Sequence, residues 1–159
     1  MKQFLFFSLF LVTLRDGCFA GEQQVRKTKV LAQGLTVQVP EGLTISSHRQ
    51  APDFELFVFK SGSNAILHVY LGNQPDFPKE KAAGPIQSQT VNGIKAESVT
   101  QKKPGGTISR EVLLRLHDKG VWPQRMHCWY ANLSEKQSSE AEQLLSSIRL
   151  VDKSRGKDP

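Results

Sequence analysis

Four histidines and one cysteine are the residues best suited to metal binding or nucleophilic chemistry. His127 and Cys128 are neighbours in a segment that predicts a β-strand over residues 125–131, and the other three are His48, His68 and His117. Successive side chains of a strand point to opposite faces, so His127 and Cys128 cannot bind one metal ion together. The sequence has neither an H-E-x-x-H nor a C-x-x-C motif. We therefore expect no metal site and no cofactor.

Catalysis is not expected either. Cys128 lies beside Trp129 and Tyr130, and a lone cysteine in an apolar strand is typical of a small buried hydrophobic residue. The Pro-Gly-Gly sequence at 104–106 lacks the Gly-Lys-Ser/Thr step of a phosphate-binding loop. The acidic residues have no spacing that pairs two carboxylates for acid–base work; they are Asp53, Glu55, Asp76, Glu97, Glu111 and Asp118. We expect a chain that is not an enzyme.

Binding to another protein is the better-supported activity, because two aromatic residues lie in predicted loops. Trp122 belongs to the turn-rich segment 117–123, and Phe77 lies between Pro75 and Pro78 in a loop over 72–85. Exposed Trp and Arg residues are common anchors of protein interfaces. For Trp122 the alternative is that its ring covers the end of a sheet.

Several basic residues could form a face for an acidic partner protein, or a solvated face without a partner. Lys102 and Lys103 lie near Arg110, Arg115, Lys119 and Arg125 in the sequence. The aromatic residues cluster in apolar strands and do not interleave with these basic residues, so we expect no nucleic-acid partner. The predicted partner-binding residues are Trp122, Phe77, Asp76, Lys102, Lys103, Asp118 and Arg125.

The N-terminus predicts export. Residues 1–20 combine Lys2, an apolar run over 4–12 and a Cys-Phe-Ala sequence before Gly21, as in a cleavable signal peptide. Lipidation of Cys18 is the alternative, although Arg15 replaces the aliphatic residue that a lipoprotein signal needs. Cleavage after Ala20 would lower the net charge from +6 to +5 and leave Cys128 as the only cysteine. We expect a periplasmic or secreted protein with no membrane span.

Sequence patterns divide the remainder into a polar arm over 21–33, one domain over 34–152 and a charged tail over 153–159. Alternating apolar residues predict a strand over 35–39. Two nearly continuous apolar runs, 54–59 and 65–71, predict a hairpin of central strands that are covered on both faces. Asn92-Gly93 predicts a tight turn, and residues 102–106 predict the tip of a further hairpin.

One helix completes the predicted fold. Ser134 and Gln137 have the spacing of a capping box before a helix over about 135–148. Its apolar residues recur at three- and four-residue spacing, so one side of the helix can pack on a sheet. The predicted fold class is α+β, with an antiparallel sheet of about six or seven strands packed against this C-terminal amphipathic helix.

Two motifs resemble those of the PsbP-like superfamily and related small exported bacterial domains. These are Gly-Leu-Thr-Val-Gln-Val-Pro-Glu-Gly at 34–42 and a closing helix that ends in Ser-Ile-Arg-Leu at 147–150; the family has Trp where this chain has Leu43. The resemblance implies an antiparallel sheet flanked by helices and a function in binding other proteins. It carries over no functional residues.

We therefore expect an exported protein-binding domain, most concretely a periplasmic inhibitor or immunity protein that neutralises a toxin. The alternative is a small-ligand-binding or envelope-accessory module that uses a pocket between the sheet and the helix. Such a pocket, with converging polar groups, would favour the alternative, whereas a flat face rimmed by loops would favour protein binding.

Overall fold

The computed structural model describes residues 26–32, 35–51, 53–78, 84–117 and 120–150. The predicted signal peptide, the lipidation alternative at Cys18 and the tail over 153–159 lie outside these residues. The elements, in chain order, are β1 (Arg26–Ala32), β2 (Leu35–Pro40), β3 (Leu43–Ala51), β4 (Phe54–Ser61), β5 (Asn64–Gly72), β6 (Gln87–Val91), β7 (Ile94–Lys102), β8 (Ile108–Arg115), β9 (Arg125–Leu133), α1 (Glu135–Ser147) and β10 (Arg149–Leu150).

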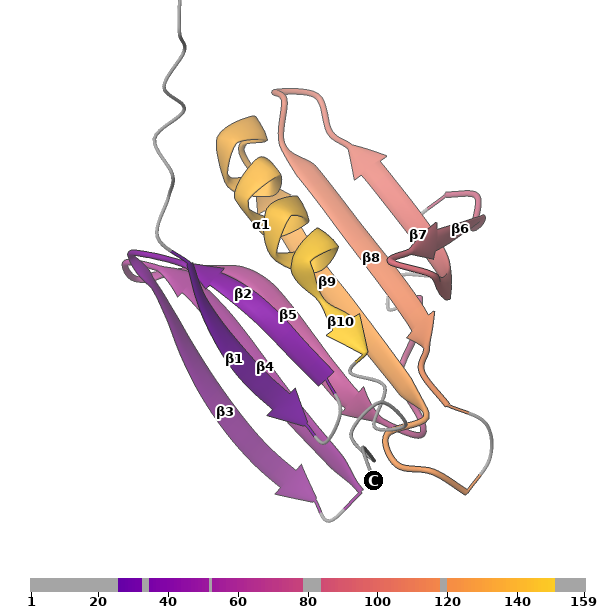
Figure 1. The fold of residues 1–159 in the computed structure, drawn as a ribbon. Helices are drawn as coiled ribbons and strands as arrows, with labels where there is room; N and C mark the ends of the chain where they lie inside the picture. The colour runs from indigo at the N-terminus through magenta and orange to yellow at the C-terminus, as the bar shows by residue number, and fades with distance from the viewer. Residues whose placement is uncertain (1–25, 33–34, 52, 79–83, 118–119, 151–159) are drawn as a thin grey trace, which may run out of the picture.

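The predicted α+β class is confirmed, with two antiparallel sheets and one C-terminal helix (Figure 1). The larger sheet has seven strands in the order β3-β4-β5-β9-β8-β7-β6, and the smaller has the order β1-β2-β10. The strand predicted over 35–39 therefore belongs to a separate sheet. Residues 26–32, which the sequence assigns to a polar arm, form strand β1 instead and pair with β2.

The Asn92-Gly93 turn forms as predicted and has a second role. Both residues have positive φ, 51° and 80°, as the two-residue turn between Val91 and Ile94 requires. The Asn92 side chain also donates hydrogen bonds to the carbonyl oxygens of Ser146 (2.8 Å) and Ile148 (2.7 Å). These bonds satisfy carbonyls at the end of α1 that have no partner within the helix.

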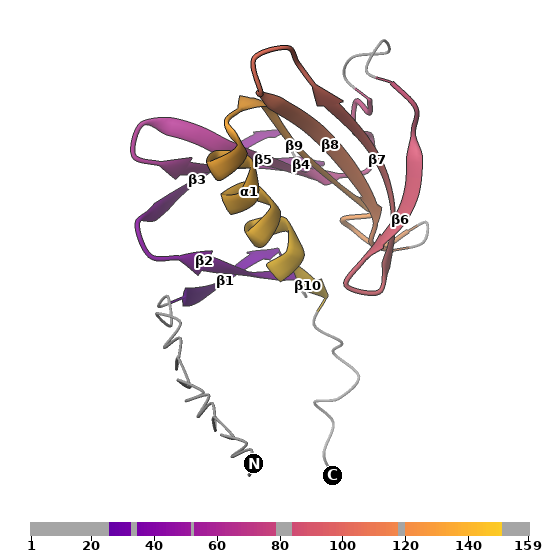
Figure 2. The same ribbon diagram turned by 90° about the horizontal axis from the view of Figure 1, so that it is seen from above.

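Helix α1 begins with the predicted capping box. The Ser134 side chain accepts a hydrogen bond from the Gln137 backbone, and the Gln137 side chain accepts one from the Ser134 backbone. The helix buries Ala141, Leu144 and Leu145 against β2, β5 and β9. Seen from above, the helix and the smaller sheet lie on the same concave side of the larger sheet (Figure 2). The hydrophobic core fills the space between them.

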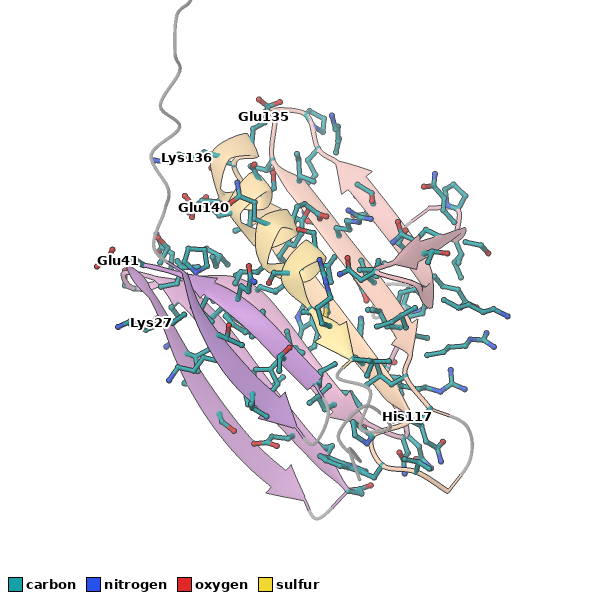
Figure 3. The ribbon with its side chains drawn as sticks, in the orientation of Figure 1. Lys27, Glu41, His117, Glu135, Lys136 and Glu140 are labelled. Carbon is teal, nitrogen blue, oxygen red and sulfur yellow. The ribbon has the colours of Figure 1, made fainter. Side chains whose placement is uncertain are left out.

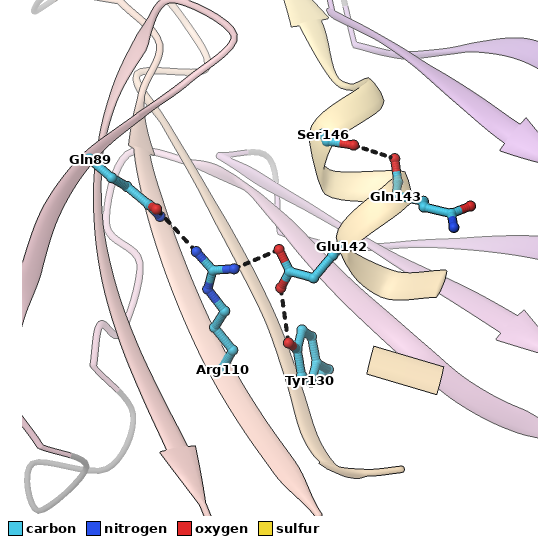
Figure 4. Close-up of polar contacts among 6 residues, drawn as sticks. All are labelled: Gln89, Arg110, Tyr130, Glu142, Gln143 and Ser146. Atoms are coloured by element: carbon cyan, nitrogen blue, oxygen red, sulfur yellow. Dashed lines mark hydrogen bonds and ion pairs between the residues drawn. The ribbon is translucent and has the colours of Figure 1, made fainter. Parts of the chain in front are cut away.

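A polar network ties the helix to strands β6, β8 and β9 of the larger sheet (Figure 4). Arg110 of β8 donates hydrogen bonds to Glu142 of α1 (2.6 Å) and to Gln89 of β6 (3.1 Å). Tyr130 of β9 donates a further hydrogen bond to Glu142 (2.9 Å). Arg110, predicted to contribute to a basic face, instead fixes the position of the helix on the sheet.

The opposite face of the larger sheet, which we call the outer face, has no helix or strand packed on it in the part of the chain that the structure describes. His68 and Tyr70 of β5 and Leu56 of β4 are only partly buried there. The prediction that β4 and β5 are covered on both faces by other elements is therefore wrong. Their apolar character comes from one core face and one aromatic outer face.

Candidate functional site

Strand alternation places an aromatic surface on the outer face. Cys128 and Tyr130 of β9 point toward the helix, since both are buried and Tyr130 bonds to Glu142. His127 and Trp129 therefore point outward. The register pairs Trp129 with His68 and His127 with Tyr70, so these four side chains share the outer face.

Ring contacts join these side chains into two groups, which the strand register places side by side. His68 stacks on Trp129 with ring centroids 5.0 Å apart, and the His127 ring lies 5.0 Å from Trp129. Tyr70 stacks on Phe54 of β4 at 5.4 Å. Aromatic pairs at such distances contribute about 0.5–1.5 kcal/mol beyond the area they bury. With Leu56, which pairs with Tyr70, these residues form what we call the outer-face cluster: Phe54, Leu56, His68, Tyr70, His127 and Trp129.

A carboxylate orients the most buried member of the cluster. Nε2 of His127 lies 2.9 Å from Oε2 of Glu111 on β8, and the His127 side chain is only 1% exposed. A histidine held by a carboxylate can serve as a general base when a nucleophile is within reach. Cys128, the adjacent thiol, points to the other face, so the pair does not activate it. His127 instead lies buried beneath the cluster, where the Glu111 carboxylate fixes the orientation of its ring.

A cavity of about 290 Å³ opens on the cluster. Its lining comes from three strands and the loop after β5: Phe54, Leu56, Tyr70, Gln74, Asp76, His127 and Trp129. Burial raises the pKa of the Tyr70 hydroxyl, and the Asp53 carboxylate raises it further against a lowering effect of the Gln74 backbone. Tyr70 therefore remains an uncharged hydroxyl at neutral pH. We call this space the outer-face cavity.

Gly72 lets the Tyr70 ring lie close to the backbone. A Cβ at position 72 would lie 2.5 Å from Oη and 2.7 Å from Cζ of Tyr70, and 3.0 Å from the carbonyl oxygen of Asp53. Only glycine leaves room for this approach. Tyr70 can therefore line the cavity in this position because glycine at position 72 has no side chain.

A second hollow of about 210 Å³ lies on the other side of Trp129. Its lining residues include Val99 and Lys103 of the β7–β8 hairpin, Glu111 of β8, and Trp129 itself. Trp129 is thus a shared wall between two hollows on one face of the sheet. It is half-buried, so part of the indole remains accessible.

Four of the seven predicted partner-binding residues lie near the outer-face cavity. Asp76 lines it, and the Phe77 ring meets His127 edge-on at 5.4 Å. Arg125, the first residue of β9, shares the outer face with His127 but does not line the cavity. Trp122 donates a hydrogen bond from its indole Nε1 to the Asp53 carbonyl at 2.9 Å, next to Phe54. This bond ties the Trp122 indole to the residue that precedes β4.

Two further predicted residues, Lys102 and Lys103, are not brought to the cavity. Lys102 and Lys103 are exposed at the β7–β8 hairpin. Lys102 pairs with Ile108 at the start of β8, whereas Arg125 pairs with Arg115 at its end, so the lysines and Arg125 lie at opposite ends of this strand. Ile108 and Arg115 are separated by roughly 23 Å along β8, at about 3.3 Å per residue. Lys103 borders the second hollow only. Asp118 and the side chain of His48 lie outside the described residues.

The histidines whose side chains the structure describes, His68, His117 and His127, do not converge as a metal site would require. His68 and His127 meet through Trp129, whereas His117 is exposed in the loop after β8 (Figure 3). Within the described ranges, no group of three or more His, Cys, Asp or Glu residues could hold a metal ion. No described helix is long and apolar enough to cross a membrane.

The Cys128 thiol should be inert in the folded chain. Its side chain is 1% exposed, and burial, with a smaller effect of the Glu142 carboxylate, raises the pKa of the thiol. Because the thiolate is the reactive form, a chain beginning at residue 21 should show no labelling by iodoacetamide in native buffer and full labelling in urea. Rapid native labelling, or a disulfide-linked dimer under native conditions, would contradict this placement.

Sequence reasoning missed the centre of the site, which is Trp129 with His68 and Tyr70. The signal was present in the spacing, because His68 and Tyr70 on β5 and His127 and Trp129 on β9 each lie two residues apart. Residues two apart in a strand share a face. Only the register shows that the two pairs meet.

No protein-family model matches the sequence, and a search of the curated proteins finds no match either. The resemblance to the PsbP-like superfamily therefore stays a prediction.

Proposed function

We propose that the chain is an exported, non-enzymatic domain that binds another protein through its outer face. The most concrete form of this function is a periplasmic inhibitor or immunity protein that neutralises a toxin by binding it. The supporting observation is the outer-face cluster, an aromatic surface that no helix or strand of the described chain covers and that carries a cavity.

The open side of the cavity favours a protein partner over a small molecule. Pockets that enclose a drug-sized ligand commonly measure roughly 300–1,000 Å³ and bury most of the ligand. The outer-face cavity has about 290 Å³ and is open to one side. A hollow of this kind accommodates one side chain that projects from a larger binding surface.

The arrangement around Trp129 resembles the centre of a protein interface. Energetically dominant residues of interfaces are enriched in Trp and Tyr and lie near the centre of the contact, surrounded by polar residues. Trp129 lies between the two hollows, with Asp76 near one end of this surface and Lys103 near the other. Both are residues that the sequence assigns to partner binding.

A small-ligand-binding module remains the second candidate, but its ligand site would be the outer-face cavity and not the space between the sheet and the helix. Core side chains such as Leu144 and Met126, both 0% exposed, pack between the sheet and the helix, so we consider the cavity on the outer face as the ligand site. The outer-face cavity does bring Gln74, Asp76 and His127 together, which favours a small polar ligand as the alternative occupant.

The test is capture of a partner by the tagged chain from residue 21 onward. The sources are the envelope of cells that make the protein and lysates of competing cells. We expect one stoichiometric partner whose hydrolytic or pore-forming activity falls when the complex forms. A folded, monomeric chain that captures nothing from either source would contradict protein binding and favour the small-ligand module.

A further inference from the structure

We propose that the outer-face cavity is a cation subsite, which receives the guanidinium group of an arginine side chain from the bound partner protein. This inference rests on the proposed function and specifies its chemistry: the partner should present an exposed arginine on the surface that meets the outer face.

Aromatic rings form most of the cavity wall. Phe54 and Tyr70 contribute a stacked pair from β4 and β5, and Trp129 contributes the wall on β9. The faces of aromatic rings carry partial negative charge, so they attract cations that lie within about 6 Å of the ring centroid, with Trp the strongest of the three. Sites that enclose a cation between several rings use the same chemistry.

The charges in the cavity have the sign that a cation needs. Among the described residues, its lining includes the carboxylate of Asp76 and no Lys or Arg. The Asp53 carboxylate lies close enough to Tyr70 to raise the pKa of its hydroxyl. The full sequence has more basic than acidic residues, 21 Lys and Arg against 15 Asp and Glu. The negative charge in the described lining is therefore opposite in sign to the net charge of the chain. Arg125 shares the face but lies outside the lining.

Arginine fits this site better than lysine. A guanidinium group is planar, so it can stack on an aromatic face while its N–H groups donate to a carboxylate. Asp76 supplies such a carboxylate, and the Gln74 side chain supplies an amide oxygen, both at the exposed rim. A lysine ammonium group is more strongly hydrated and gains less from stacking.

The test uses the intact chain and a matched pair of probes, N-acetyl-arginine amide and N-acetyl-citrulline amide, which differ chiefly in charge. Binding is followed through the Trp129 indole N–H signal by NMR, assigned with a Trp122→Phe variant. We expect the arginine probe to shift this signal saturably and to bind at least about tenfold more tightly than the citrulline probe.

The matched variants are Asp76→Asn in the cavity and Glu140→Gln on helix α1 (Figure 3), which remove the same charge at two places. We expect Asp76→Asn to weaken arginine binding several-fold and Glu140→Gln to leave it unchanged. Equal shifts with both probes, or equal effects of both variants, would overturn the cation subsite. Partner capture that persists in that case would leave the proposed function standing, so the two failures can be distinguished.

Discussion

Replacing Trp129 by alanine should reduce partner affinity by at least about 30-fold, which corresponds to about 2 kcal/mol. Trp129 lines both hollows of the outer face, and its ring contacts His68 and His127. Its removal would open the two hollows into one shallow depression and take away the strongest aromatic face. The measurement is the dissociation constant of the captured partner by isothermal titration calorimetry.

Trp122→Phe is the matched control for this substitution. It removes the hydrogen bond from the indole to the Asp53 carbonyl but leaves the outer-face cluster intact. We expect an affinity change of less than about threefold. Urea unfolding should show that both variants fold, because both indoles are partly exposed in the wild-type chain. An unchanged affinity for a folded Trp129→Ala variant would show that the partner binds elsewhere.

Gly72→Ala should destabilise the fold by about 1–3 kcal/mol and also weaken partner binding. The new methyl group would lie 2.5 Å from Oη of Tyr70 and 3.0 Å from a backbone oxygen, so the ring must move away. This movement removes the stacked pair that Tyr70 forms with Phe54 and changes the cavity wall. Urea denaturation gives the change in the free energy of unfolding.

The same substitution in a Tyr70→Leu chain shows whether the loss of stability comes from the clash with the Tyr70 ring or from a general effect on the backbone at position 72. In a Tyr70→Leu chain the aromatic atoms near position 72 are absent, so Gly72→Ala should cost clearly less free energy there than in the wild type. Contacting residues give non-additive effects of about 0.5–3 kcal/mol. Equal costs in both backgrounds would mean that the close approach of Tyr70 does not determine the requirement for glycine.

Local patterns predicted the elements of the fold well. The capping box at Ser134 and the Asn92-Gly93 turn depend on residues close in sequence, and both form as predicted. The separate three-stranded sheet was not predicted, because the period-two pattern of residues 35–39 shows that one face is buried but not which strands pair with it. The polar residues of β1 likewise gave no sign that their backbone pairs with β2.

The site was predicted only in part, for a similar reason. Phe77 and Asp76 were identified because they lie in a proline-rich loop, and that loop does reach the cavity. Trp129 was placed only in an apolar strand beside Cys128 and was given no binding role. The partial exposure of Trp129 is a tertiary property that neither spacing nor composition records, because it depends on which of the described elements pack on each face of the sheet.

The most direct test of the outer face as the binding surface is site-specific photo-cross-linking in the cells that make the protein. A benzophenone amino acid is placed at Asp76, beside the cavity, or at Lys136, which is exposed on helix α1 (Figure 3). We predict a defined cross-linked partner from position 76 that is lost with Trp129→Ala, and none from position 136. A cross-link from position 136 but not from position 76 would contradict the proposed binding surface.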